Sequence, residues 1–109
     1  MTTLSEQDFR LEADRALEQA QRALLPLADQ EGFEVELQNG VLQVVFETPT
    51  ATKFVVSPNA PVRQIWVSAM SRSFKLSWVA DAALFALDGE ALNALLERLA
   101  LEQIGGVMQ

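Results

Sequence analysis

Apolar residues recur every three to four positions near the start of the chain, the spacing of one face of an α-helix. Ser5 followed by Asp8, or Thr3 followed by Glu6, supplies a helix N-cap signal just before this pattern. We therefore predict a long amphipathic helix as the first element. Its apolar stripe comprises Phe9, Ala13, Ala16, Leu17, Ala20, Leu24 and Leu27.

A proline interrupts the predicted helix before its apolar stripe is complete. Pro26 disfavours helical geometry at Leu25, because its ring clashes with the preceding residue and it has no N–H to donate. We expect the helix to end or kink near this point. The chain from about Leu27 to Gly32 is then expected to be irregular.

Beyond residue 32 the pattern changes to alternation with a period of two, which is typical of half-buried strands. The first two predicted strands flank Asn39-Gly40, the strongest short-range signal for a β-hairpin. Turn residues gather again at Ser57–Pro61 and at Asp88-Gly89. The predicted strands cover residues 33–38, 41–47, 53–56, 63–70, 73–79 and, with the weakest alternation, 83–87.

A second amphipathic helix is predicted from about Glu90 to Ile104, ending at the two glycines that follow. Two such helices around hairpin-linked strands can bury their apolar stripes only on one face of an antiparallel sheet. We predict one α+β domain over residues 1–109, a two-layer sandwich of order α-β-β-β-β-β-β-α with five to six strands. The other face of the sheet should meet solvent or a partner.

Composition removes several classes of function. The net charge of −7 falls entirely in the first 50 residues, a distribution that repels nucleic acid and anionic lipid and attracts cations or basic protein surfaces. The chain has no cysteine and no histidine, and no phosphate-binding loop or nucleophile motif is present. We expect a non-enzymatic protein of the cytosol, because the acidic start is unlike a signal peptide and no apolar run approaches a membrane span.

Alternation in the strand at 63–70 predicts which side chains the open face presents. Ile65, Val67 and Ala69 suit the side covered by helices, which sends Gln64, Trp66, Ser68 and Met70 to the open side. Trp66 in that position favours a protein contact, because aromatic side chains bury much area at a low cost in rotamer entropy. The alternative is that Trp66 packs flat on neighbouring strands. For Phe74 and Trp78, which share a face with Leu76, we expect core packing.

Surface carboxylates provide a second candidate site. Oxygen ligands suit hard cations, so a metal ion bound here would be held weakly at an open, hydrated site. Asp14 and Glu18 are one helical turn apart, and Glu34 and Glu36 share a strand face, so each pair is placed to share an ion. The alternative is a solvated acidic face that only keeps the protein soluble. The candidate metal residues are Asp14, Glu18, Asp29, Glu31, Glu34 and Glu36.

The element order and one strand together resemble the frataxin family. Pro61-Val-Arg-Gln64-Ile-Trp66-Val-Ser68 is similar to that family's Pro-x-x-Gln-(Ile/Val)-Trp-(Leu/Val)-(Ala/Ser) pattern. The hairpin Leu37–Leu42 is similar to the family's Gly-Val-Leu passage, and Phe9–Glu34 aligns without gaps with bacterial frataxins of the CyaY type. The resemblance covers nearly the whole chain.

Departures from the family pattern are also visible. Bacterial frataxins place paired carboxylates on the second half of the first helix, where this chain has Gln21, Arg22, Leu25 and Pro26. In the turn between strands three and four, where the family pattern has an asparagine, this chain has Ser57. A tryptophan expected in strand six is replaced by Ala83, or by Phe85 if the preceding loop shifts.

The resemblance implies a protein of iron–sulfur cluster assembly that binds and modulates a cysteine desulfurase and its scaffold protein. It also implies weak, carboxylate-only binding of Fe²⁺ or Fe³⁺ and donation of that iron. Because the helix carboxylates are depleted while the Gln-x-Trp strand remains, we favour modulation over iron carriage. The alternative is an interaction module that keeps only the fold and binds no metal. The residues expected to bind a partner are Gln64, Trp66, Ser68, Asn59 and Arg63.

Overall fold

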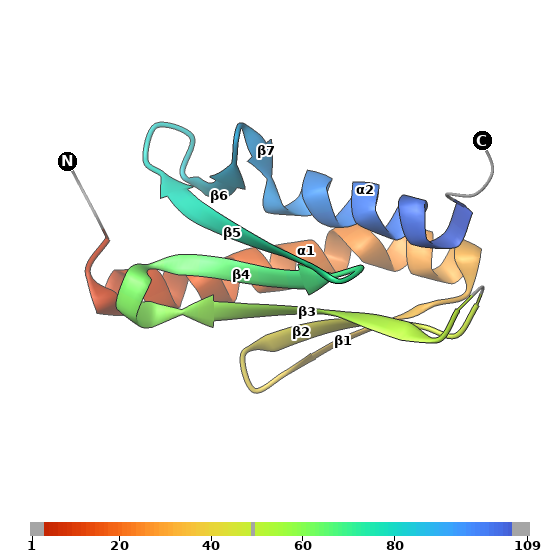
Figure 1. Ribbon diagram of the computed structural model, residues 1–109. Helices are drawn as coiled ribbons and strands as arrows, with labels where there is room; N and C mark the ends of the chain where they lie inside the picture. The colour runs from red at the N-terminus through yellow and green to blue at the C-terminus, as the bar shows by residue number, and fades with distance from the viewer. Residues whose placement is uncertain (1–3, 49, 106–109) are drawn as a thin grey trace.

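Two helices lie side by side on one face of an antiparallel sheet, and the opposite face is left open (Figure 1). The computed structural model describes residues 4–48 and 50–105. This arrangement confirms the predicted two-layer α+β sandwich, with seven strands in place of five to six. The elements are α1 Glu6–Glu31, β1 Glu34–Gln38, β2 Val41–Phe46, β3 Thr52–Asn59, the 3₁₀ turn η1 Ala60–Val62, β4 Gln64–Ala69, β5 Arg72–Val79, β6 Leu84–Leu87, β7 Glu90–Ala91 and α2 Leu92–Gly105.

Strand order in the sheet follows the order along the chain, so every strand pairs with its sequence neighbours. The predicted hairpin is present: Gln38 pairs with Val41 across a turn in which Asn39 has φ 55° and Gly40 has φ 76°. Two successive positive φ angles are what a two-residue turn of the right twist requires. Short connections of this kind make the sheet a simple meander.

Helix α1 runs through Pro26 to Glu31, so the prediction of an irregular segment from about Leu27 to Gly32 was wrong. Pro26 is exposed, and the apolar stripe continues past it with Ala28 buried. Burial of that stripe outweighs the one backbone hydrogen bond that proline cannot donate. The helix ends at Gly32, whose positive φ of 83° allows its N–H to donate to the Ala28 carbonyl at 2.8 Å.

At the start of α1, one of the two predicted caps is seen directly. The Ser5 hydroxyl accepts a hydrogen bond of 3.1 Å from the backbone N–H of Asp8. This contact satisfies one of the N–H groups that have no partner within the helix. Thr3 lies outside the described residues.

The second helix begins two residues later than predicted. Glu90 pairs with Leu87 and Ala91 with Ala86, which makes the short strand β7. The turn before it holds Asp88 at φ 52° and Gly89 at φ 84°, the geometry of a hairpin, so the chain turns back onto β6 before it can form a helix. The strand predicted at 83–87 is confirmed as β6, Leu84–Leu87.

Strand β3 is longer than predicted. It continues through Ser57 and Pro58 to Asn59, and the chain reverses in η1 and at Arg63. Pro58 lies opposite Ile65 in the register with β4, and its missing N–H sits near the end of the pairing, where the cost is small. As a result Asn59 comes opposite Gln64.

The core lies between the helices and the sheet. Ile65, Val67 and Leu76 are buried as predicted, and Phe74 and Trp78 pack half-buried against the same core. The prediction for Met70 was wrong: it also packs against the core, because it lies after the end of β4 in a turn with φ 54° that breaks the alternation. Within the described ranges no helix is long and apolar enough to cross a bilayer.

Candidate functional site

The open face of the sheet is built from alternate residues of adjacent strands. Since Ile65, Val67 and Ala69 of β4 point into the core, Gln64, Trp66 and Ser68 point away from the helices. This placement agrees with the sequence prediction. The indole is 37% exposed, which is unusual for so large an apolar group and leaves it available to a partner.

Neighbouring side chains hold Trp66 in place. Its Nε1 donates a hydrogen bond of 2.9 Å to Oε1 of Gln64. The Gln64 amide nitrogen in turn donates to the hydroxyl of Ser77, which lies opposite it on β5, at 3.4 Å. Nζ of Lys75, also on β5, lies over the indole ring, 5.0 Å from its centroid. The indole is therefore oriented before any partner arrives.

Lys75 and Ser77 were not among the predicted partner-binding residues, although the sequence carries a signal for them. Ser73, Lys75 and Ser77 are the polar positions of an alternating strand, so they must share one face. What the alternation did not give was the register. Only the pairing of Trp66 with Lys75 shows that the ammonium lies across from the indole.

The remaining partner-binding candidates have different surroundings. Ser68 is exposed and lies between Val55 of β3 and Ser73 of β5. Asn59 is half-buried, opposite Gln64, at the end of β3. Both border the Trp66 side chain or its hydrogen-bond partner, so they form one continuous surface with it.

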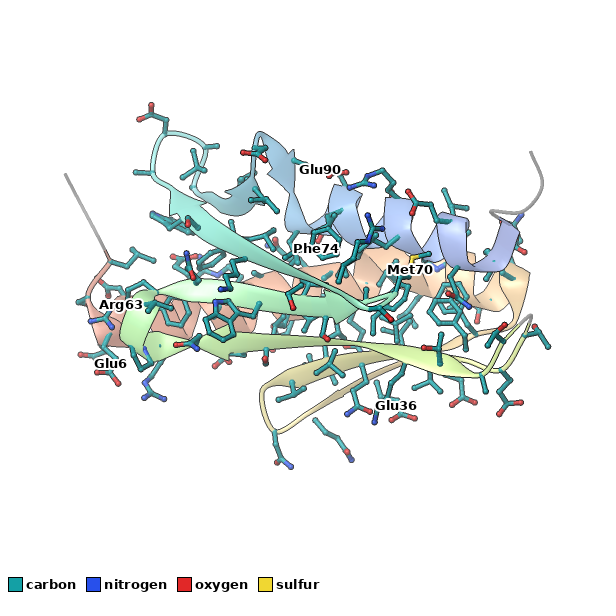
Figure 2. The ribbon with its side chains drawn as sticks, viewed as in Figure 1. Glu6, Glu36, Arg63, Met70, Phe74 and Glu90 are labelled. Carbon is teal, nitrogen blue, oxygen red and sulfur yellow. The ribbon has the colours of Figure 1, made fainter. Side chains whose placement is uncertain are left out.

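Arg63 is engaged within the chain. Its Nε donates to the backbone carbonyl of Leu4 at 3.0 Å, and its Nη1 donates to the carbonyl of Ala60. These contacts fasten the segment before α1 to the turn between β3 and β4. Arg63 and Glu6 lie at the same end of the molecule (Figure 2), and the positive charge of Arg63 adds to the effect of Arg10 in lowering the pKa of Glu6. A role of Arg63 in partner binding stays a prediction.

The predicted metal carboxylates are distributed over three places. Asp14 and Glu18 border a shallow hollow between α1 and the β1–β2 turn, where Leu37 and Gly40 also line the surface. Asp29 and Glu31 lie in the last turn of α1. All six predicted residues are exposed.

Glu34 and Glu36 lie on the open face of β1, on the other side of the sheet from the helix carboxylates. Figure 2 shows Glu36 projecting outward from the β1–β2 hairpin. Among residues 4–48 and 50–105 no three acidic side chains come together in a way that would hold a metal ion. The predicted residues therefore form separate pairs, each offering too few ligands for a closed site.

Charge is divided across the open face. The acidic pair on β1 lies at one edge, whereas Lys53 on β3 and Lys75 on β5 supply positive charge farther along the sheet. Such a division favours one orientation of a partner over the reverse, since like charges would meet if the partner turned round. The oriented indole lies on the basic side.

Comparison with known proteins gives consistent results over most of the chain. Residues 2–106 match the model of the frataxin-like domain family. The iron-sulfur cluster assembly protein CyaY of Pseudomonas aeruginosa is 40% identical over 81 residues, which are 71% of this chain and 73% of that protein. CyaY of a Janthinobacterium species is 29% identical over 106 residues, covering 95% of this chain and 93% of the relative.

Two solved structures share the fold. Frataxin from Psychromonas ingrahamii superposes with a TM-score of 0.68 at 15% identity, over 92% of this chain and 91% of that chain. Yeast frataxin also gives a TM-score of 0.68, at 20% identity, over 94% of this chain and 85% of that chain. At such low identity these matches establish the arrangement of the elements.

Proposed function

The chain belongs to the frataxin-like family, and from this premise we propose that it acts in iron–sulfur cluster assembly as a non-catalytic binding protein. In this proposal the open face of the sheet docks on the complex of a cysteine desulfurase with its scaffold protein and changes the rate of sulfide release. The relatives of this chain that are 40% and 29% identical to it are named for iron–sulfur cluster assembly.

One observation supports this role above others: Trp66 is exposed, and yet two neighbouring side chains hold its ring. A hydrogen bond to Gln64 and the ammonium of Lys75 fix the ring, so binding costs little side-chain entropy. An oriented aromatic ring with nearby polar groups has the composition of an interface hot spot. The serines around it on β4 and β5 have small side chains, which leave room for the backbone of a partner to come close.

We propose iron binding as a secondary activity. Carboxylates in the last turn of α1 face the negative end of the helix dipole, where no basic side chain offsets them. A cation would relieve this repulsion. Because the acidic pairs are separate and exposed, we propose weak, hydrated binding of Fe²⁺ that loads iron near the scaffold.

The test is sulfide release by the cognate desulfurase with its scaffold and Fe²⁺, with and without this protein. We expect a change of rate that Trp66→Ala abolishes, or that in this variant needs about tenfold more protein to reach half of its maximum, a loss typical of an aromatic anchor. Leu11→Ala is the matched control, because Leu11 is another exposed large apolar side chain but lies on α1. Equal effects of the two variants would contradict docking through the open face.

Iron is tested separately by anaerobic titration of the protein with Fe²⁺. Saturable binding that weakens in Asp29→Asn/Glu31→Gln or in Glu34→Gln/Glu36→Gln supports a carboxylate site. The absence of saturable binding, together with an intact effect on sulfide release, would leave a regulator that carries no iron. The absence of both would leave an interaction module of this fold.

A further inference from the structure

A cavity of about 310 Å³ lies on the helix side of the molecule, away from the open face. Its walls come from the middle of α1, from β5, β6 and β7, from the turn before β6, and from the start of α2. Figure 1 shows β5, β6, β7 and the start of α2 near one another. Trp78, Leu84, Phe85 and Leu92 form its apolar lining. Its volume is at the lower end of the range found for small-molecule sites.

Aromatic rings in mutual contact form one wall of this cavity. The rings of Trp78 and Phe85 meet edge to face with their centroids 5.1 Å apart, and Phe85 in turn meets Phe9 of α1 edge to face at 5.7 Å. Phe85 is buried and Trp78 half-buried. One side of the indole therefore remains available to an apolar group entering the cavity.

Small side chains account for the empty space. Ala16 on α1, Ala83 in the turn before β6, and Ala91 on β7 all line the cavity. The cavity therefore presents open space beside the aromatic wall formed by Trp78 and Phe85.

The rim carries one charge of each sign. Nη1 of Arg15 lies 3.4 Å from both carboxylate oxygens of Glu12, one helical turn away. These contacts are long for a charge-assisted pair and leave Nε and Nη2 of Arg15 free of other hydrogen bonds within the described ranges. The amides of Gln19 and Asn93 complete the polar part of the rim.

From these observations we propose that the cavity binds a free α-amino acid with a large apolar or aromatic side chain. The side chain enters between Trp78 and Leu92, the carboxylate pairs with the guanidinium of Arg15, and the ammonium pairs with the carboxylate of Glu12. A zwitterion fits this rim because it offers each charge a partner that can come closer than the 3.4 Å contact between Arg15 and Glu12. No part of the proposed site belongs to the Trp66 surface, so the two proposals stand or fall separately.

L-Phenylalanine is the probe, titrated into the isotope-labelled protein and followed by two-dimensional NMR. The chain has two tryptophans, and a Trp66→Phe variant assigns their indole N–H signals. We expect saturable shifts of the Trp78 indole and of the amides of Leu84 and Asn93, with the Trp66 indole unmoved. No saturable shift up to the solubility limit, or shifts centred on Trp66, would overturn the proposal.

Two analogues test the zwitterion. Phenethylamine lacks the carboxylate and 3-phenylpropionate lacks the ammonium, so each should bind about tenfold more weakly than L-phenylalanine, as expected for one lost charge-assisted contact. Arg15→Gln should remove the advantage of the amino acid over phenethylamine, and Glu12→Gln its advantage over 3-phenylpropionate. Equal binding of all three compounds would show that the rim charges play no part and would refute the assignment.

Filling the cavity provides the steric test. Ala83→Trp should abolish binding, whereas Ala82→Trp, at the exposed neighbouring position that does not line the cavity, should leave it within about twofold. Ala16→Leu fills the space from the helix side and replaces Ala83→Trp if that variant does not fold. Binding that survives a folded filling variant would place the amino acid elsewhere and refute this site.

Discussion

The indole N–H of Trp66 donates a 2.9 Å hydrogen bond to the side-chain carbonyl of Gln64, two positions earlier on the same strand. Residues i and i+2 share a face of a strand, so the Gln-x-Trp spacing in the sequence is a geometric requirement of this contact. The bond links the polar and the aromatic part of the open face into one unit.

Replacing Gln64 by leucine should weaken partner binding while leaving the fold intact. The variant loses the hydrogen bond that orients the indole, and an exposed bond of this kind is worth about 0.5–1.5 kcal/mol, or a two- to tenfold change in affinity. The measurement is titration calorimetry with the desulfurase–scaffold complex. Ser73→Ala, which alters a polar side chain on the same face without touching Trp66, is the control; a larger loss for this control would contradict the assigned role.

The ion pair of Glu90 with Arg98 should make stability depend on pH in the acid range. Arg98 donates two hydrogen bonds of 2.9 Å to the Glu90 carboxylate, and this contact lowers the pKa of Glu90. A lowered pKa in the folded state stabilises above the ordinary pKa, and the contribution is lost as pH falls through the folded value.

The corresponding variant is Glu90→Gln. At pH 7 it should be less stable by no more than about 1 kcal/mol, as for a surface ion pair, and the difference from the unaltered chain should vanish between about pH 5 and pH 3. Thermal unfolding followed by circular dichroism at several pH values gives the comparison. A difference that persists at low pH would show that packing, and not charge, is responsible.

Two leucines two positions apart on α2 should respond very differently to truncation. Leu99 is fully buried whereas Leu101 is 52% exposed. Leu99→Ala leaves a cavity and should cost about 2–5 kcal/mol, while Leu101→Ala should stay within about 0.5 kcal/mol. Urea unfolding measures both free energies. Similar losses at the two positions would mean that α2 packs with its other face toward the sheet.

Pro26→Ala should stabilise the protein. Pro26 lies inside α1 on an exposed position, where it withholds one backbone hydrogen bond, and helix propensity favours alanine by about 3 kcal/mol in a helix interior. Part of this gain is offset because proline also restricts the unfolded chain, so we expect an increase of about 1–2 kcal/mol. The free energy of unfolding in urea is the measurement. A loss of stability would indicate that the ring of Pro26 makes a contact with its surroundings that matters.

The amino-acid sequence alone determined the fold class, most of the elements and the face on which Trp66 lies. These depend on local rules: the 3.6-residue and two-residue periods, the Asn39-Gly40 turn, and the alternation of Gln64, Ile65 and Trp66. Prediction from the sequence failed at two places. At Pro26, burial of the apolar stripe of α1 outweighed the preference of proline. At Glu90, the Asp88-Gly89 hairpin placed the residue in β7 and not in the helix.

Tertiary structure alone decided which distant residues meet. The pairing register set Lys75 against Trp66, and the packing of α1 beside β6 and α2 left a cavity bounded by Ala16 and Ala83. It also separated the carboxylates of α1 from those of β1. Periodicity fixes the direction of a side chain relative to its own element, but distances between elements depend on how all the side chains in the core fill space together, which no local pattern records.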